Sequence, residues 1–460
     1  MRILKFFSPK VRKVFSTTLS TKHYFFYVPM WLKNYQLHQT LSSVFSVFFR
    51  HGGLKTFSLF LLLSTTLTAQ ISLPTTLDTN SRKFSLSLLS SHDIQTSSIN
   101  KIFARKLING GLIKDELIQS NFDKHKTINH LGREFTNNLA VIIQNPFKKI
   151  EKLTSLDLLF EAGYASIVSA VYSKDLFGLV FKGNQNYIGD TADFSGTNFQ
   201  YVDFQNIGIG FSHNKTKTSL SVNYVNIQNY LTSNFSTATV FFAEDSAQID
   251  LDLNGDLNST FSQKFNKGSG FSLNFKANIE VPWKDDSNAF FQFQVQNFGF
   301  AKVENILRYR SDTTISYSGF NVDNLINLST NYLENNLWQD TLNIKQDTIS
   351  SWIILPVMFQ FGKILNANST YKLQSFFGIK MYPSLKYTPK IYAGIDYLLL
   401  KNFHAGLSAS YGGFGNFRAG LYLNYSSEKI NFGIGTEDFY ALISKKAYGQ
   451  AVNIRLNYAF

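Results

Sequence analysis

The histidines are the first residues to consider for metal binding, because the sequence contains no cysteine. Five of them lie downstream of Gln70: His92, His125, His130, His213 and His404. His125 and His130 are five residues apart, so they lack the i, i+4 spacing with which a helix presents two zinc ligands. We therefore expect these histidines to be solvent-exposed or to face an internal channel, and we expect no metal site.

Asp250, Asp252, Asn254 and Gly255 resemble the opening of a calcium-binding loop. The twelfth position of such a loop supplies a bidentate carboxylate, whereas here it is Phe261. Three apolar residues alternate with the polar ones: Ile249, Leu251 and Leu253. This alternation favours a β-strand with one acidic face over a calcium site.

Hydrolysis would require a serine placed as a nucleophile, and the chain has no Gly-x-Ser-x-Gly motif to place one. It also has no glycine-rich motif of the kind that binds phosphate. Gly412, Gly413 and Gly415 fall between two apolar segments, where a turn with positive φ accounts for them. We predict a non-enzymatic protein without a cofactor.

The last ten residues, Ala451–Phe460, show which element dominates the chain. Apolar side chains occupy one face of this segment: Val452, Ile454, Leu456, Tyr458 and Phe460. Polar or small side chains occupy the other: Asn453, Arg455, Asn457 and Ala459. Alternation with a period of two over about ten residues is typical of one tilted strand that crosses a membrane.

The same alternation recurs along the chain, with turns between the segments. It predicts strands at residues 133–146, 154–168, 200–214, 217–231, 268–281, 287–300, 303–317, 350–364, 370–381, 389–400, 403–412, 416–426, 429–437 and 448–460. Repeated hairpins favour an antiparallel meander, and a bilayer requires the sheet to close so that no edge stays unpaired. The predicted fold class is all-β: a closed antiparallel transmembrane β-barrel of about 14 strands.

Two segments depart from this pattern. Ile99–Asp123 has helical spacing interrupted by Gly110 and Gly111, and Lys174–Phe181 predicts a second short helix. We expect the first segment to form a short helical N-terminal plug or cap, or a periplasmic element. A surface loop with two helical turns is its alternative. Residues 318–349 are rich in Asn, Asp and Thr and predict a long external loop.

Composition is consistent with a membrane barrel. Aromatic residues make up 16% of the chain and charged residues also 16%, whereas a soluble domain has about 25% charged residues. Strands whose side chains alternate between a lipid-facing and a water-facing side give this combination of many aromatic and few charged residues, although a soluble β-sandwich gives a similar one.

Nine of the 44 basic residues precede Asp78, the first acidic residue, so the rest of the chain holds 35 basic and 31 acidic residues. No basic stripe remains for a phosphate backbone, which argues against nucleic-acid binding.

The N-terminal region predicts a targeting signal. Lys55 precedes an uncharged apolar run and Ala69 follows it, so we expect a secretory signal peptide at residues 54–69, cleaved between Ala69 and Gln70. An uncleaved anchor is the alternative, although the run is shorter than the roughly 20 residues of a membrane span.

The predicted organisation has four parts. We expect residues 1–53 to be an extension from a start site assigned too early, the alternative being a long n-region. The signal peptide at 54–69 follows. Next come an N-terminal segment with the helical plug or cap at 70–132, and the outer-membrane barrel at 133–460.

Several short motifs carry a family resemblance. They are Lys174–Phe177, Gly183–Asn184, Tyr187–Gly189, Asp193–Gly196, Leu355–Pro356, Ser410–Gly415 and Ala447–Gln450. In this order, spread over most of residues 70–460, they resemble a family of Gram-negative outer-membrane β-barrels. That family is akin to the long-chain fatty-acid transporter superfamily and to barrel proteins associated with type IX secretion. The resemblance implies a barrel in the outer membrane of the cell envelope and implies no substrate, and residues 1–53 have no counterpart in it.

Several functions remain open at this point. The first is passage or binding of a small apolar solute. The second is a structural or interaction role in the envelope, with secretion-system proteins as partners. The third is a barrel-wall lipid hydrolase, which needs a serine and a histidine brought together at one wall. A soluble β-protein is the alternative to all of them.

The C-terminal strand suggests how the chain reaches the membrane. Leu456, Tyr458 and Phe460 share one face, and a terminal strand ending in Phe resembles the signal read by the barrel assembly machinery. We therefore expect these residues to serve insertion into outer-membrane lipid rather than chemistry.

Overall fold

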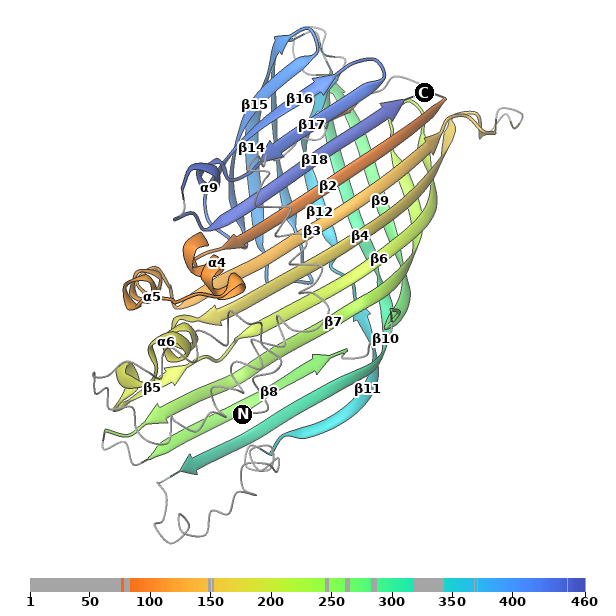
Figure 1. Cartoon of the computed structure of the whole chain (residues 1–460). Coiled ribbons are helices and arrows are strands. Elements are labelled where there is room, and N and C mark those ends of the chain that lie inside the picture. Colours follow the sequence, from red (N-terminus) through yellow and green to blue (C-terminus); the bar gives the residue numbers. More distant parts are fainter. Residues whose placement is uncertain are drawn as a thin grey trace. The chain divides into compact units, whose positions relative to one another are not determined.

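The protein is described from a computed structural model (Figure 1). The chain divides into two compact units, Met1–Phe60 and Leu61–Phe460, and every described residue belongs to the second. The described residues are 76–77, 83–147, 150, 153–244, 248–260, 265–282, 288–317, 343–367, 369, 371–444 and 446–459. The predicted extension at 1–53, the signal peptide at 54–69 with its cleavage site Ala69–Gln70, most of the 318–349 loop, and Phe460 all lie outside them.

Strands make up most of the described unit, and short helices lie between some of them. The elements are β1 Thr76–Leu77, β2 Phe84–Thr96, α4 Lys101–Asn109, α5 Asp115–Phe122, β3 Ile128–Ile143, β4 Leu156–Ser173, α6 Lys174–Lys182, η3 Gln185–Tyr187, β5 Asp190–Asp193, β6 Asn198–His213, β7 Ser219–Phe242, β8 Ile249–Ser259, β9 Gly268–Pro282, β10 Asn288–Tyr317, β11 Lys345–Ile354, β12 Met358–Asn366, β13 Leu373–Met381, β14 Thr388–Leu400, β15 Phe403–Gly413, β16 Arg418–Ser426, β17 Ile430–Thr436, α9 Phe439–Ile443 and β18 Gly449–Ala459. None of the described helices is long and apolar enough to cross a membrane.

The strands close into a barrel. The order around the wall is β2-β3-β4-β6-β7-β9-β10-β12-β13-β14-β15-β16-β17-β18, and β18 pairs with β2 to complete the ring. Neighbouring strands in this ring are antiparallel. The closed antiparallel barrel of about 14 strands predicted from the sequence is therefore confirmed.

Two wall strands are much longer than the rest. β7 has 24 residues and β10 has 30, whereas about 9–11 residues suffice for a membrane strand. β10 pairs with β9 and then β8 on one side, and with β12 and then β11 on the other. The far parts of β7 and β10, together with β8 and β11, form an extension of the wall that we call the projecting wall (Figure 1).

The wall differs from the predicted strands at three places. β2 is a wall strand, although it lies within residues 70–132, where the sequence indicated only a helical element. Residues 287–300 and 303–317, predicted as two strands, form the single strand β10. Polar Ser90 and His92 interrupt the apolar alternation in β2, while register shifts near Asn297 and Asn305 interrupt it in β10. These two differences cancel in the strand count. Residues 350–364, predicted as one strand, are divided between β11, which ends at Ile354, and β12, which begins at Met358.

The two ends of the barrel have different connections. Short turns join β6 to β7, β14 to β15 and β16 to β17 at one end, which we call the short-turn end. Longer segments join β2 to β3, β4 to β6, β10 to β11 and β17 to β18 at the other, the long-loop end. Helices α9, α4, α5 and α6 follow one another along the long-loop rim (Figure 1).

Local signals explain the rim helices. The Asn100 side chain accepts a hydrogen bond from the Phe103 N–H at 2.9 Å and so caps α4. Gly110, with φ of 78°, ends that helix before α5 begins. Phe103 is fully buried and packs against Phe177 of α6, with ring centroids 5.4 Å apart. The helical segments predicted at 99–123 and 174–181 are confirmed, and they pack on each other at the rim.

Candidate functional site

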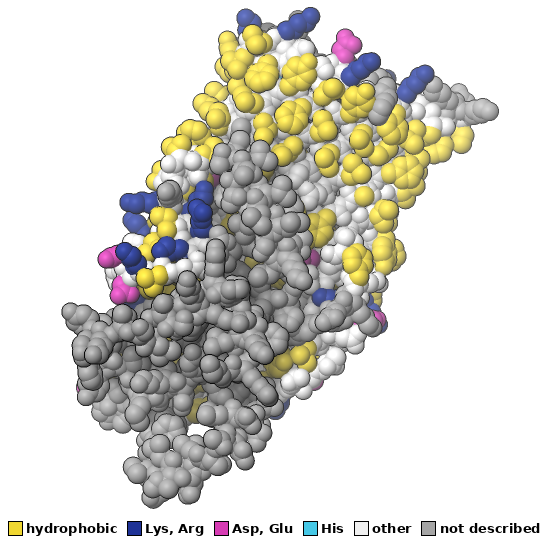
Figure 2. All heavy atoms as spheres, viewed as in Figure 1, with side chains coloured by type: hydrophobic (Ala, Val, Ile, Leu, Met, Phe, Trp, Pro, Cys, Tyr) yellow, Lys and Arg dark blue, Asp and Glu magenta, His cyan; other side chains and the backbone are white. Residues whose placement is uncertain are grey.

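The outer face of the wall is apolar. On β6, Ile207, Ile209 and Phe211 point outward and are 64%, 52% and 47% exposed, while Gly208 and Gly210 between them face inward. The paired residues of β7 follow the same pattern. Figure 2 shows hydrophobic side chains spread over the wall strands that are visible in that view. We call this surface the apolar belt; a water-soluble monomer rarely exposes so large an apolar area.

The inner face carries an unusual apolar cluster, which we call the lumen core. It consists of ten buried hydrophobic side chains: Ala165, Val202, Phe204, Val225, Ile227, Ala301, Val303, Ile306, Ile353 and Leu355. They come from β4, β6 and β7 and from β10, β11 and the residue after β11. Membrane barrels usually have a polar interior, so this part of the lumen is apolar where polar side chains would be expected.

Glycines let the two sides of the lumen core meet. Gly268 and Gly270 of β9 lie between β7 and β10 and face inward. A Cβ atom on Gly270 would lie 2.0 Å from the Phe300 carbonyl oxygen and 2.5 Å from the Ala301 Cα. A larger side chain would therefore not fit here, where Gly270 is paired with Val225 on one side and Ala301 on the other.

Another part of the lumen holds charged groups, which we call the ion network. Its members are Asp93, Glu134, Lys380, Lys390, Arg418 and Glu437. Lys380 Nζ donates to Glu134 Oε1 at 2.6 Å, and Lys390 Nζ donates to Glu437 Oε2 at 2.7 Å. Arg418 donates to Asp93 Oδ1 at 3.0 Å and to Glu437 Oε2 at 2.5 Å. Buried charges persist only when paired, so these contacts tie distant wall strands together.

Aromatic residues from the loops lie beside the ion network. Phe414, between β15 and β16, is buried, and its ring packs at 4.8 Å and 84° against that of Tyr387. A Cβ atom on Gly132 of β3 would lie 2.1 Å from the Phe414 ring. Gly132 is therefore the position that admits Phe414. These loops fold into the lumen from the long-loop end.

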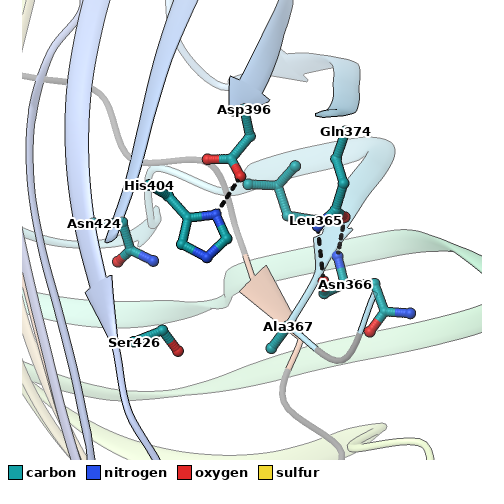
Figure 3. Close-up of a pocket in the computed structure, with 8 residues that line it drawn as sticks. All are labelled: Leu365, Asn366, Ala367, Gln374, Asp396, His404, Asn424 and Ser426. Carbon is teal, nitrogen blue, oxygen red and sulfur yellow. Dashed lines mark hydrogen bonds and ion pairs between the residues drawn. The ribbon is translucent and has the colours of Figure 1, made fainter. Parts of the chain in front are cut away.

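Asp396 and His404 form a pair near the short-turn end (Figure 3). His404 Nδ1 lies 2.7 Å from Asp396 Oδ2, and the Tyr422 hydroxyl donates to Asp396 Oδ1 at 2.8 Å. The pair borders a hollow of about 10 Å³, enough for about one water molecule. Ser426 lines the same hollow, and its hydroxyl accepts a hydrogen bond from Asn431 Nδ2 at 3.2 Å.

This pair bears on the hydrolase hypothesis. A serine hydrolase needs a hydrogen bond between the nucleophile and its base. Within the described residues, no hydrogen bond joins Ser426 to His404. The pair also faces the lumen, whereas a barrel-wall lipid hydrolase would need it on the outer surface.

The structure keeps the five histidines apart and gives them different surroundings. His404 faces the lumen, and His213 lies at the β6–β7 turn with Nδ1 3.1 Å from Thr216 Oγ1. His125 departs from the expectation of an exposed or channel-facing side chain, because it is 5% exposed among the rim helices. No cluster of three or more His, Cys, Asp or Glu side chains with metal-binding geometry occurs among the described residues.

His125 is held by two polar partners. Its Nδ1 lies 2.7 Å from the Asn121 carbonyl oxygen, and its Nε2 lies 3.2 Å from the Tyr172 hydroxyl. Its ring packs on Phe177, with centroids 4.0 Å apart. Burial is the main cause that lowers the pKa of His125, and the nearby Lys174 ammonium adds to it, against the hydrogen bond to Asn121. The rim helices therefore pack around a neutral imidazole at neutral pH.

The segment that resembles a calcium loop lies in β8, Ile249–Ser259, as a strand with polar residues on one face. Asp250 accepts hydrogen bonds from Gln248 Nε2 at 2.9 Å and from Ser316 Oγ at 2.6 Å. Asn254 Nδ2 donates to Asp312 Oδ1 at 2.9 Å. Neighbouring side chains thus satisfy this face, as a strand requires, while Phe261 lies outside the described residues.

Two of the predicted assembly-signal residues lie in β18. Leu456 is 37% exposed on the outer face, and Tyr458 pairs with Leu86 of β2 and with Ile430 of β17. Arg455, on the opposite face, is buried in the lumen and donates to Asn424 Oδ1 at 3.1 Å. The position of β18 at the closure of the barrel is compatible with a role in assembly.

Sequence reasoning missed the lumen core and the ion network. Their residues fall on the inward positions of the strands, and charged residues such as Arg418 and Asp93 could be noticed there as departures from the local pattern. Their partners could not be identified, because Arg418 and Asp93 are 325 positions apart.

Comparisons with known proteins give only distant likenesses. No protein-family model and no curated protein sequence matches the chain. Among solved structures, the translocator domain of the autotransporter NalP from Neisseria meningitidis is 10% identical with a TM-score of 0.26, covering 84% of this chain and 91% of that one. The toluene transporter TbuX from Ralstonia pickettii is 7% identical with a TM-score of 0.26, covering 83% and 90%.

A mutant of the monoaromatic hydrocarbon channel TodX is 10% identical with a TM-score of 0.29, covering 81% of this chain and 88% of that one. Scores of this size carry no argument about function. The barrel assignment rests on the strand pairing described above.

Proposed function

We propose that this chain is an outer-membrane β-barrel that binds a small apolar solute in its lumen and passes it across the membrane. The lumen core carries the proposal. Buried apolar side chains line the inside of the barrel, where a water-filled pore would present polar groups. An apolar site of this kind stays dry and favours an apolar guest.

The wall of the barrel supports the proposed location in the outer membrane. A closed ring of strands leaves no unpaired backbone edge, which is the condition for spanning a bilayer with strands. The apolar belt provides the lipid-facing surface. Outer-membrane barrels have short periplasmic turns and longer external loops, so the short-turn end would face the periplasm.

The lumen core also limits the mode of transport. Its side chains come from neighbouring strands of the wall and are packed against one another, and the ion network occupies a separate part. An open ion-conducting pore is therefore not what we propose. A solute would enter by separating the lumen-core side chains, and its own apolar surface would replace their contacts.

The proposal can be tested with an apolar fluorescent probe. N-phenyl-1-naphthylamine brightens on entering a dry site, and we expect saturable binding to the folded barrel. The variant Ile227→Asn places an amide in the lumen core. We expect it to weaken probe binding about tenfold, because an unpaired buried polar group costs about 1–3 kcal/mol.

A matched control uses a buried inward side chain that is already polar. Ser272→Ala on β9 changes a position outside the lumen core and should leave probe binding unchanged. Binding that is unsaturable, or equal in both variants, would contradict the proposal. Heat-modifiable migration in gels checks separately that each variant is a folded barrel.

A second candidate function is an envelope component that docks secretion-system proteins. The projecting wall favours it, because β10 continues well beyond the length that a membrane requires. Exposed charged groups there include the ion pair between Arg308 and Asp347. A surface of this kind suits a protein partner better than lipid.

The absence of cysteine makes this second candidate easy to test. A single Thr348→Cys on β11 can carry a photo-crosslinker at an exposed position of the projecting wall. We expect discrete cross-linked species in intact cells. Lys429→Cys at the short-turn end is the control, and identical adducts from both positions would count against a docking role.

A further inference from the structure

The long-loop rim beside β15 to β18 has an aromatic edge. Tyr411 at the end of β15 is 62% exposed, and Phe417 before β16 is 67% exposed. The short helix α9 adds Tyr440, which is 52% exposed, and Ile443, which is 71% exposed. Girdles of aromatic residues mark the two interfaces of a membrane barrel. This edge therefore marks the level at which lipid headgroups would lie.

Cationic side chains lie directly beside α9. The Lys101 backbone N–H in α4 donates to the Ala447 carbonyl oxygen at 2.8 Å, and Lys101 Nζ donates to the Ala441 carbonyl oxygen at 3.1 Å. These bonds hold α4 against the segment that contains α9. Arg105 follows one turn later in α4, and Lys446 follows α9, and both are exposed. Figure 2 shows Lys and Arg side chains gathered at this rim.

The positive charge at this place is only partly balanced. Asp438 is the acidic group next to Lys101, but its carboxylate caps α9 by accepting a hydrogen bond from the Ala441 N–H at 3.0 Å. Burial raises the pKa of Asp438. Within the described residues, neither Arg105 nor Lys446 takes part in an ion pair. An anion would therefore find uncompensated cations here.

We propose that α9 and the first turns of α4 form a binding surface for the phosphorylated headgroup of a membrane lipid. Tyr440 and Ile443 would contact the acyl chains, and Arg105 and Lys446, with Lys101 behind them, would bind the phosphate. The inference rests on the proposed membrane location and deepens it. Basic groups beside an apolar interfacial helix are the usual combination for recognising anionic lipid.

The cationic side chains and the apolar side chains of α9 together favour a lipid as the ligand. A free phosphate ion would use the cations and leave the apolar side chains of α9 in water. A protein partner would not require the aromatic edge to continue into the apolar belt. A lipid satisfies both at once, because its phosphate and its acyl chains are joined at the same level.

The experiment measures lipid retention by native mass spectrometry. The full chain, folded in a neutral detergent, is titrated with dioctanoyl phosphatidic acid and, in parallel, with dioctanoyl phosphatidylcholine. We expect tighter retention of the phosphatidic acid. The double variant Arg105→Ala/Lys446→Ala should weaken its retention about 10- to 30-fold, as expected when two cations are removed from the phosphate.

A matched double variant removes the same charge from the other end of the barrel. Lys401→Ala/Lys429→Ala lies at the short-turn end and should retain phosphatidic acid like the wild type. Equal retention of the two lipids, or equal loss in both double variants, would overturn the inference. Displacement of the lipid by millimolar inorganic phosphate would also overturn it, in favour of a free-anion site.

The same samples separate this inference from the proposed membrane location. Heat-modifiable migration after reconstitution into phosphatidylcholine vesicles reports insertion. A chain that inserts but shows no lipid preference contradicts only the lipid site. A chain that inserts into no vesicle contradicts both.

Discussion

His125 is a residue that couples the rim helices to the wall. It contacts the α5 end through Asn121, β4 through Tyr172, and α6 through Phe177. Because burial lowers its pKa, the folded chain holds a neutral imidazole at a pH where an unfolded one would already bind a proton. This single side chain therefore makes the packing of α5 and α6 sensitive to acid.

We expect the rim helices to loosen when the pH falls from 7.5 to 5. The unfolded imidazole has the ordinary pKa of 6.5, and the folded one has a lower pKa. Stability is therefore present above 6.5 and is lost as the pH drops below it toward the folded value. Hydrogen exchange of the α4 and α5 amides would report the change as faster exchange at pH 5.

Two variants serve as controls for the pH effect. His125→Gln removes the titrating group and should make exchange in α4 and α5 nearly independent of pH after correction for intrinsic rates. His213→Gln, at the short-turn end, should behave like the wild type. Unchanged pH dependence in His125→Gln would show that another group is responsible.

At the scale of elements, strands could be predicted well from the sequence wherever one face is largely apolar. β16, β17 and β18 were placed correctly because apolar residues dominate their outward positions. β2 was missed because Ser90 and His92 occupy outward positions between Leu88 and Ile94. A rule based on alternation cannot assign a strand whose outer face is partly polar.

The C-terminal strand β18 should direct insertion of the barrel into the outer membrane. Removing Phe460 should leave the chain in the periplasm instead of the outer membrane, because in the sequence this residue continues the alternating apolar pattern that starts at Val452. Cell fractionation with heat-modifiable migration measures the outcome. The conservative variant Phe460→Tyr should still insert. Normal insertion of the truncated chain would show that Phe460 is not part of the assembly signal.

At the scale of the whole molecule, the lumen has two different interiors. The lumen core is apolar, whereas the ion network is charged, with Asp93, Lys390 and Arg418 buried and Lys380 and Glu437 partly exposed. The fold class could be predicted because the apolar belt repeats in most of the wall strands. The division of the lumen into an apolar part and a charged part could not be predicted from the sequence. It depends on which inward residues lie close together once the barrel has closed, and on the close approach of strands at glycines such as Gly270.

The ion network should contribute strongly to barrel stability. Arg418→Ala leaves Asp93 and Glu437 buried without their shared cation, and we expect a loss of about 3–5 kcal/mol in the free energy of unfolding. Guanidinium denaturation, followed by heat-modifiable migration, measures it. The exposed Lys429→Ala should change stability by less than about 0.5 kcal/mol.

A compensated variant separates charge pairing from packing. Combining Arg418→Met with Asp93→Leu and Glu437→Leu removes the whole group and should recover most of the loss, since apolar replacement of a buried ion cluster is often neutral. In this variant Lys390 has lost its partner Glu437. Its side chain must then turn toward solvent, or Lys390 must also be replaced by Met. If the free energy of unfolding of Arg418→Ala equals that of Lys429→Ala, the ion network contributes little to stability.

β10 contains two asparagines, Asn297 and Asn305, with φ of 58° and 53°. Each lies where the pairing of β10 shifts by a residue, the first against β9 and the second against β11. Asparagine tolerates this conformation better than most residues. The segments that pair with β10 beyond these positions, which include all of β8, can therefore acquire their alignment only when the bulges have formed. During folding, an error at either asparagine would turn every following side chain of β10 to the wrong face.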